Sequence, residues 1–113
     1  MKLKILKSKI HRATVTEACL DYEGSISIDS NLMRVAGIVN YEKVHVLNIT
    51  NGNRLETYAI PSDKKGEICV NGAAAHLINP GDVVIIVAYA QMEYKDAVNY
   101  KPKIVLVDEK NEK

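Results

Sequence analysis

The segment Lys43-Val-His-Val-Leu-Asn-Ile-Thr-Asn-Gly-Asn-Arg-Leu-Glu-Thr-Tyr-Ala-Ile60 decides the fold class. Residues 43–49 are apolar and β-branched, as is typical of a strand. Asn51-Gly52 is a strong signal for a hairpin with a two-residue turn. Residues 53–60 then form the returning strand. The segment therefore predicts an antiparallel β-hairpin.

Further strands are indicated on both sides of this hairpin by alternating or continuous apolar residues. They are residues 1–20 (one or two strands), 25–28, 67–70, 83–90 (buried on both faces) and 103–107. Asp29 can cap a short helix that ends at Gly37. We expect a polar turn at 61–66, a helical turn before the last strand, and a frayed tail from Asp108. Many short strands with one or two short helices predict a mainly β fold, a small closed barrel.

The composition fits a single domain over residues 1–113, with 47% hydrophobic and 26% charged residues. The formal net charge of +1 gives no reason to expect nucleic acid or an anionic membrane as a partner. Cys19 and Cys69 form no CxxC pair, and the first eleven residues do not resemble a signal peptide. The longest apolar run, 83–90, is far short of the roughly 18 residues of a membrane span. We expect free, buried thiols and a cytoplasmic protein.

Covalent chemistry is possible within Tyr22-Glu23-Gly24-Ser25. Glycine tolerates strained backbone, so the Ser25 hydroxyl can reach the Gly24 carbonyl and form an ester by an N-to-O acyl shift. Elimination and hydrolysis would then cut the chain and leave a pyruvoyl group, an electrophilic ketone. The alternative is an ordinary turn, in which Gly-Ser is a common dipeptide.

Polar side chains on the predicted strands form a second candidate group. Lys9 and His11 share a face because they lie two residues apart in an extended segment. Arg54 and Tyr58 share another face, which offers a planar fork for a carboxylate and a phenolic proton donor. Thr57 has the opposite parity, so it reaches the same site only if the strand is bulged or the site wraps around it. The alternative is a solvated sheet face with a few salt links.

The small-residue stretch Asn71-Gly72-Ala73-Ala74-Ala75 can present backbone N–H groups to an anion, but the pattern favours an ordinary helix start. No metal site is expected, because the histidines and cysteines lack ligand spacing.

Four blocks of this sequence together resemble the aspartate decarboxylase family, over residues 1–107 and in the family's order. They are Lys9-Ile-His-Arg-Ala-Thr-Val-Thr, Tyr22-Glu-Gly-Ser-Ile-Ser-Ile-Asp, Thr50-Asn-Gly-Asn-Arg-Leu-Glu-Thr-Tyr-Ala-Ile, and Asn71-Gly-Ala-Ala-Ala-His followed by Gly81-Asp82. The resemblance implies a double-psi β barrel that assembles as a homotetramer with active sites between subunits. It implies a proenzyme that cleaves itself between Gly24 and Ser25 into a β chain, 1–24, and an α chain, 25–113.

By the same resemblance, the enzyme converts L-aspartate to β-alanine and CO2 for pantothenate synthesis, with a covalent pyruvoyl cofactor made from Ser25 that takes the substrate amine as an imine. The implied roles are proton donor for Tyr58, processing and substrate contact for Thr57, carboxylate binding for Lys9 and Arg54, and lining of the substrate site for Gly72, Ala73 and Ala74. Three roles stay open for His11 and Asn71: contact with the substrate, support of the site, or folding of the barrel alone.

The residues leave other functions open. A pyruvoyl enzyme for another amino acid and a non-catalytic, ligand-binding barrel are the alternatives. The need for an accessory maturation factor is also open.

Overall fold

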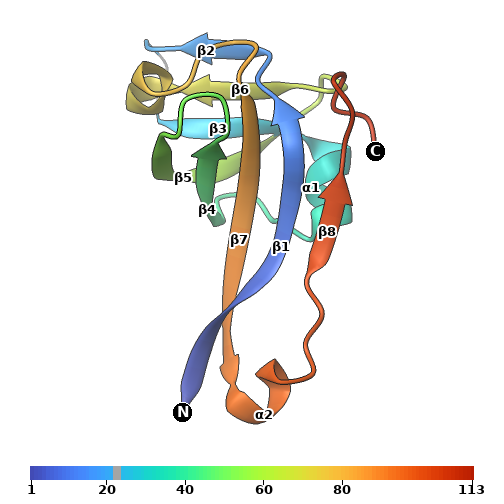
Figure 1. Cartoon of the computed structure of the whole chain (residues 1–113). Coiled ribbons are helices and arrows are strands. Elements are labelled where there is room, and N and C mark those ends of the chain that lie inside the picture. Colours follow the sequence, from blue (N-terminus) through green and yellow to red (C-terminus); the bar gives the residue numbers. More distant parts are fainter. Residues whose placement is uncertain (22–23) are drawn as a thin grey trace.

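The computed structural model describes residues 1–21 and 24–113 (Figure 1). The strands are β1 (Lys2–Thr14), β2 (Glu17–Cys19), β3 (Ser25–Asp29), β4 (Lys43–Asn48), β5 (Arg54–Ser62), β6 (Ile68–Asn71), β7 (Val83–Glu93) and β8 (Lys103–Leu106). The helices are α1 (Ser30–Ala36), α2 (Tyr94–Ala97) and the 3-10 helix η1 (Gly72–His76). The predicted mainly β fold with short helices is confirmed.

The strands are hydrogen-bonded in the order β2-β6-β3-β5-β4-β7-β1-β8. The pairs β1–β8, β2–β6 and β3–β5 are parallel, and the other neighbours are antiparallel. The sheet curls because β1 runs directly on into β2, which pairs at the far side. At that junction Val15 N–H donates to Asp82 O at 2.9 Å and Thr16 N–H to Ile68 O at 2.8 Å, which closes the barrel.

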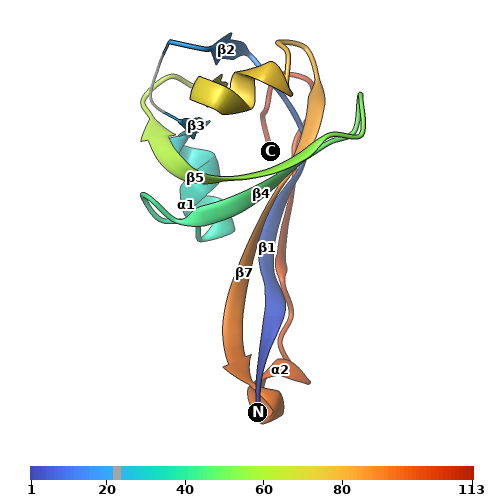
Figure 2. The ribbon, with the colours of Figure 1, turned by 90° about the vertical axis from the view of Figure 1, so that its left-hand side faces the viewer.

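A two-stranded arm projects from the barrel, as Figures 1 and 2 both show. The first half of β1 and the last half of β7 form it, and α2 covers its end. The molecule is consequently elongated, with principal extents of 43, 26 and 25 Å.

The barrel core is aliphatic because the chain contains no Phe or Trp. Its largest fully buried side chains include Ile10, Ile26, Ile28, Ile68, Ile78 and Ile86. Each such side chain contributes about 1.5–3 kcal/mol of transfer free energy. The predicted burial of 83–90 on both faces is wrong. Val84, Ile86 and Ala88 are buried on one face, but Val83 and Ile85 on the other are half-buried, and beyond Ala88 the strand enters the arm, where Tyr89 is exposed.

Helix α1 forms where the sequence predicts it. Asp29 Oδ1 accepts a hydrogen bond from the Asn31 N–H at 2.8 Å, which caps the first turn. Gly37, with φ of 73°, ends the helix in the left-handed conformation. The helix packs over the barrel through Leu32, Met33 and Ala36.

The predicted two-residue turn between β4 and β5 is wrong. The connection spans residues 49–53, and Asn48 N–H donates to Asn53 O at 2.8 Å across its base. A two-residue type I′ turn needs positive φ at both central residues, whereas here Gly52 has it, at 81°, and Asn51 does not. The side chain of Asn51 instead accepts from the Asn53 N–H at 2.9 Å, which stabilises a wider loop.

Two other expectations are also corrected. The turn predicted for 61–66 starts later, because Pro61 and Ser62 still pair with β3. The tail from Asp108 is not frayed, since the Asp108 N–H donates to Glu112 O at 2.9 Å and Asn111 is only 3% exposed.

Candidate active site

The candidate cleavage position lies at the start of β3. Ser25 is the first residue of the strand and is 2% exposed, whereas Gly24 before it is exposed. Apart from its neighbours in the chain, no described residue has a heavy atom within 4 Å of the position that a Cβ on Gly24 would occupy. The predicted motif continues through Tyr22 and Glu23, which lie outside the described residues.

Asn71 connects Ser25 to its surroundings. The two residues are antiparallel partners between β3 and β6. Asn71 Nδ2 donates to Ser25 Oγ at 2.9 Å and to Ser27 Oγ at 3.1 Å. The thiol of Cys69 donates to Asn71 Oδ1 at 3.2 Å. Of the roles left open for Asn71, the structure places it against the Ser25 hydroxyl.

The residues that follow Asn71 turn away from β6 into η1. Gly72 is buried and has φ of 69°, a left-handed conformation that favours glycine. Ala73 is exposed and Ala74 is half-buried. The helix start predicted at Asn71-Gly72 is therefore present, as a short 3-10 turn beside Ser25.

Thr57 and Tyr58 lie on β5, which runs parallel to β3. Ile26 pairs with Ala59, so Ser25 and Tyr58 each directly precede one member of this pair. The described pairings of β5 with β3 and β4 contain no register shift. Thr57 and Tyr58 therefore point to opposite faces, and the bulge that would bring both to one face is absent from this part of the chain.

Lys9 and Arg54 lie away from Ser25 within this chain. Arg54 begins β5, four residues before Tyr58, which corresponds to roughly 13 Å along a strand. Lys9 lies on β1 opposite Val87, and strands β7 and β4 separate it from β5. A site that contains Ser25, Lys9 and Arg54 therefore cannot form inside one copy of the barrel as it is arranged here.

His11 follows Lys9 on the same face of β1. Its Nδ1 atom is buried and has no hydrogen-bond partner among the described residues. Burial lowers the pKa of His11 below 6.5, and the charges of Lys9 and Arg12 lower it further.

Sequence reasoning missed Ser27 and Cys69. The signal was available, because Ser25 and Ser27 lie two residues apart, as do Cys69 and Asn71, so each pair shares a face. Burial, followed by the charges of Glu17 and Glu67, raises the pKa of the Cys69 thiol to about 11.

A cavity of about 380 Å³ opens beside these residues. Ser27, Cys69 and Asn71 line it together with Cys19. Both cysteines are free, as predicted, but Cys19 is only half-buried because it faces this cavity.

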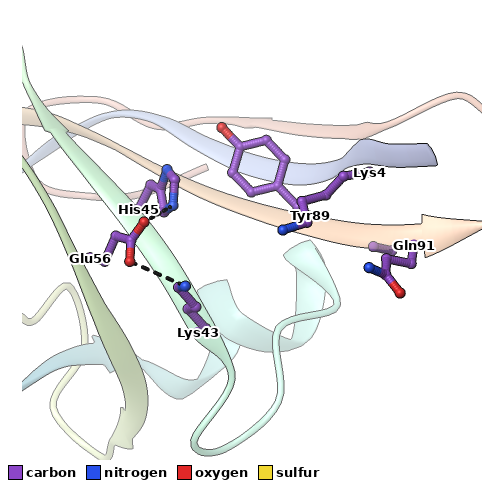
Figure 3. A pocket seen from close by; sticks show the side chains of 7 residues that line it. Lys4, Lys43, His45, Glu56, Tyr89 and Gln91 are labelled. Carbon is purple, nitrogen blue, oxygen red and sulfur yellow. Dashed lines mark ion pairs between the residues drawn. The ribbon is translucent and has the colours of Figure 1, made fainter. Parts of the chain in front are cut away.

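A second cavity, of about 330 Å³, lies on the outer face of β4, β5 and β7 (Figure 3). There Glu56 accepts from Lys43 Nζ at 3.1 Å and pairs with His45 Nε2 at 3.0 Å, as the dashed lines in Figure 3 mark. The Lys43 hydrogen bond and charge lower the pKa of Glu56. More than half of the Lys43 and Glu56 side chains is exposed, so this ion pair is solvated and contributes little to stability.

The described residues contain no group of three or more His, Cys, Asp or Glu side chains placed to hold a metal ion. No helix in the described ranges is long and apolar enough to cross a membrane.

The chain is similar to a rationally designed protein, mkDPBB_sym1, with a TM-score of 0.48 and 13% identity over 76% of this chain and 96% of that one. Proteins named aspartate 1-decarboxylase are far more similar in sequence. The protein from Campylobacter fetus is 55% identical over 99% of this chain and 97% of its own length.

Two further relatives carry the same name. The protein from Thermoanaerobacter pseudethanolicus is 56% identical over 98% of this chain and 96% of its own. That from Myxococcus xanthus is 56% identical over 98% and 86% respectively. The family model described as aspartate decarboxylase matches residues 1–113. The chain therefore belongs to the aspartate decarboxylase family and is a lyase.

Proposed function

We propose that this chain is made as a precursor, cuts itself between Gly24 and Ser25, and then converts L-aspartate to β-alanine and CO2 for pantothenate synthesis. The observation that carries the proposal is the Ser25 hydroxyl, buried and hydrogen-bonded to Asn71 directly after an open glycine. Membership of the aspartate decarboxylase family supports the reaction and the substrate. The cytoplasm is the expected compartment, which agrees with two free cysteines.

The self-cleavage uses only atoms of the chain and one water. Ser25 Oγ attacks the Gly24 carbonyl carbon, a C–O bond forms, the peptide C–N bond breaks, and the proton moves to the Ser25 nitrogen. Loss of the Ser25 α-proton with cleavage of the Cβ–Oγ bond releases Gly24 as a carboxylate. Water then replaces the enamine nitrogen, which leaves as ammonia, and residue 25 becomes a pyruvoyl group.

The residues around Ser25 fit such a group. The Asn71 amide donor already faces an oxygen at this position, and Gly72 and Ala74 beside it add no bulk. When present, a ketone joined to the substrate amine is an electron sink for the loss of CO2. Ser27 Oγ accepts a second hydrogen bond from the same amide, at 3.1 Å.

Three of the expected site residues act on the substrate's carboxylates and on its proton. Arg54 pairs with the β-carboxylate through two parallel N–H donors, and Lys9 attracts the other carboxylate. The Tyr58 hydroxyl returns a proton to the former α-carbon. Lys9 lies across the sheet from Ser25, and Arg54 lies at the far end of the adjacent strand, so a neighbouring subunit of a homotetramer would supply them.

The test is the intact mass of the purified protein under denaturing conditions. We expect two chains, 1–24 and 25–113, with the second lighter by one ammonia than an N-terminal serine requires. Cleavage of the purified chain alone would also show that no maturation factor is needed. The variant Ser25→Ala should remain one chain and release no CO2 from aspartate.

Two results would redirect the proposal. A wild-type chain that stays intact after prolonged warming and decarboxylates no amino acid favours a non-catalytic barrel. Two chains that release CO2 from a different amino acid across a panel keep the cleavage and reassign the substrate.

A further inference from the structure

The Cys69 thiol is linked to the Ser25 hydroxyl through one side chain, Asn71. Asn71 Oδ1 accepts from the thiol at 3.2 Å, and its Nδ2 donates to Ser25 Oγ at 2.9 Å. Cys69 is 7% exposed and Asn71 is 3% exposed, so water does not readily replace either contact. The chain of contacts belongs to β6 and β3, which pair directly.

The direction of the Asn71 amide decides what Ser25 experiences. A side-chain amide has one accepting end and one donating end. With Oδ1 toward Cys69, the donating end meets Ser25 and Ser27; a reversed amide would make both hydroxyls donors instead. Because burial keeps the Cys69 pKa near 11, the thiol is protonated at neutral pH and has a hydrogen to donate to Oδ1.

We propose that Cys69 is a positioning residue for self-cleavage, whose S–H holds the Asn71 amide so that Nδ2 donates to Ser25 Oγ. The inference rests on the proposed cleavage at Gly24-Ser25. In that step Ser25 Oγ gives up its proton as the C–O bond forms, and a donor aimed at the oxygen stabilises the negative charge that develops on it. Because Ser25 Oγ is the acceptor in its contact with Asn71, that contact does not use the Ser25 hydroxyl hydrogen, which can leave as the C–O bond forms.

Cys19 provides a matched comparison. It is the chain's other cysteine, is free, and lines the same cavity as Cys69. It is also a neighbour of Asn71, as its parallel partner between β2 and β6. Among the described contacts, however, only Cys69 donates to the Asn71 amide oxygen.

The experiment measures the rate of cleavage by intact mass in the wild-type chain and in three variants. Cys69→Ala removes the donor, and we expect cleavage about tenfold slower, the effect of one hydrogen bond. Cys69→Ser restores a donor, and its rate should lie within about threefold of wild type. Cys19→Ala should cleave at the wild-type rate. Far-UV circular dichroism and thermal unfolding of each variant confirm that it is folded.

A second readout does not depend on cleavage. The side-chain amide protons of Asn71, observed by NMR in uncleaved protein, should exchange slowly in wild type and Cys69→Ser and faster in Cys69→Ala. A Cys69→Ala chain with the wild-type rate, or a Cys69→Ser chain as slow as Cys69→Ala, overturns the inference. If the wild-type chain never cleaves, the proposed function fails. The inference is overturned separately if the Asn71 amide protons exchange at the wild-type rate in Cys69→Ala.

Discussion

Asn111 and Thr14 exchange two hydrogen bonds across 97 residues of sequence. The Thr14 N–H donates to Asn111 Oδ1 at 2.7 Å, and Asn111 Nδ2 donates to Thr14 O at 2.8 Å. The same Nδ2 donates to Gly66 O at 2.7 Å. One side chain thus joins the end of β1, the turn before β6 and the C-terminal tail.

We expect Asn111→Ala to lower the free energy of unfolding by about 2–4 kcal/mol. The change removes the Asn111 partner from the half-buried Thr14 and the buried Gly66 backbone, and it places alanine at a φ of 60°. Urea unfolding at fixed protein concentration measures the loss. Glu109→Ala, on an exposed residue of the same tail, should stay within about 0.5 kcal/mol of wild type; equal effects would contradict the role of Asn111.

Gly66→Ala should destabilise the protein more than Gly52→Ala. Both glycines have positive φ, 76° and 81°, so alanine is strained at either position by about 1 kcal/mol. At Gly66 the new Cβ would also lie 2.7 Å from the Lys110 carbonyl oxygen, whereas at Gly52 nothing lies within 4 Å. Thermal unfolding compares the two. Deleting residues 109–113 should remove the difference, and a difference that persists would assign it to another contact.

Tyr58→Phe should slow decarboxylation of aspartate at least about a hundredfold while leaving self-cleavage intact, because it removes only the proposed proton donor. Tyr41→Phe is the matched control, since its ring lies 6.1 Å from that of Tyr58, centre to centre. Product formation per cleaved chain separates the two activities. Full activity in Tyr58→Phe would remove the phenol from the reaction.

The pKa of His11 should lie below 6.5, and Lys9→Met should raise it. Burial is the main cause, and the Lys9 charge adds to it. Because the folded state resists protonation, the stability contributed by His11 is present above pH 6.5 and is lost as the pH falls below it. An NMR titration of the His11 imidazole protons measures this pKa in wild type and in Lys9→Met. Lys4→Met, on the same strand, should leave the His11 pKa unchanged.

Local signals predicted most of the secondary structure. Alternation located the strands, and Asp29 and Gly37 marked the ends of α1 because capping depends on neighbouring residues. The errors came from distant contacts. Asn111 orders the tail through β1, and β3 extends β5 through Ser62. A local window of sequence shows neither that Asn111 meets Thr14 nor that Ser62 pairs with β3.

The candidate site was predictable only in part. The family blocks located Ser25 and Asn71, and the structure brings them together. Spacing shows that Ser27 shares a face with Ser25 and Cys69 with Asn71, but it does not show that these two faces meet, which depends on the pairing of β3 with β6. The separation of Lys9 from Ser25 depends on strand order, which spacing along the chain does not determine.

Strands β1 and β2 both precede Gly24, and together they contact β6, β7 and β8. A break after Gly24 would therefore divide the barrel wall between two polypeptides without removing any strand from it. The short piece would be retained by the same ladders that close the barrel. Folding would then have to precede the break. If the break came first, the two pieces would have to associate as separate molecules, which depends on their concentration, instead of pairing as two parts of one chain.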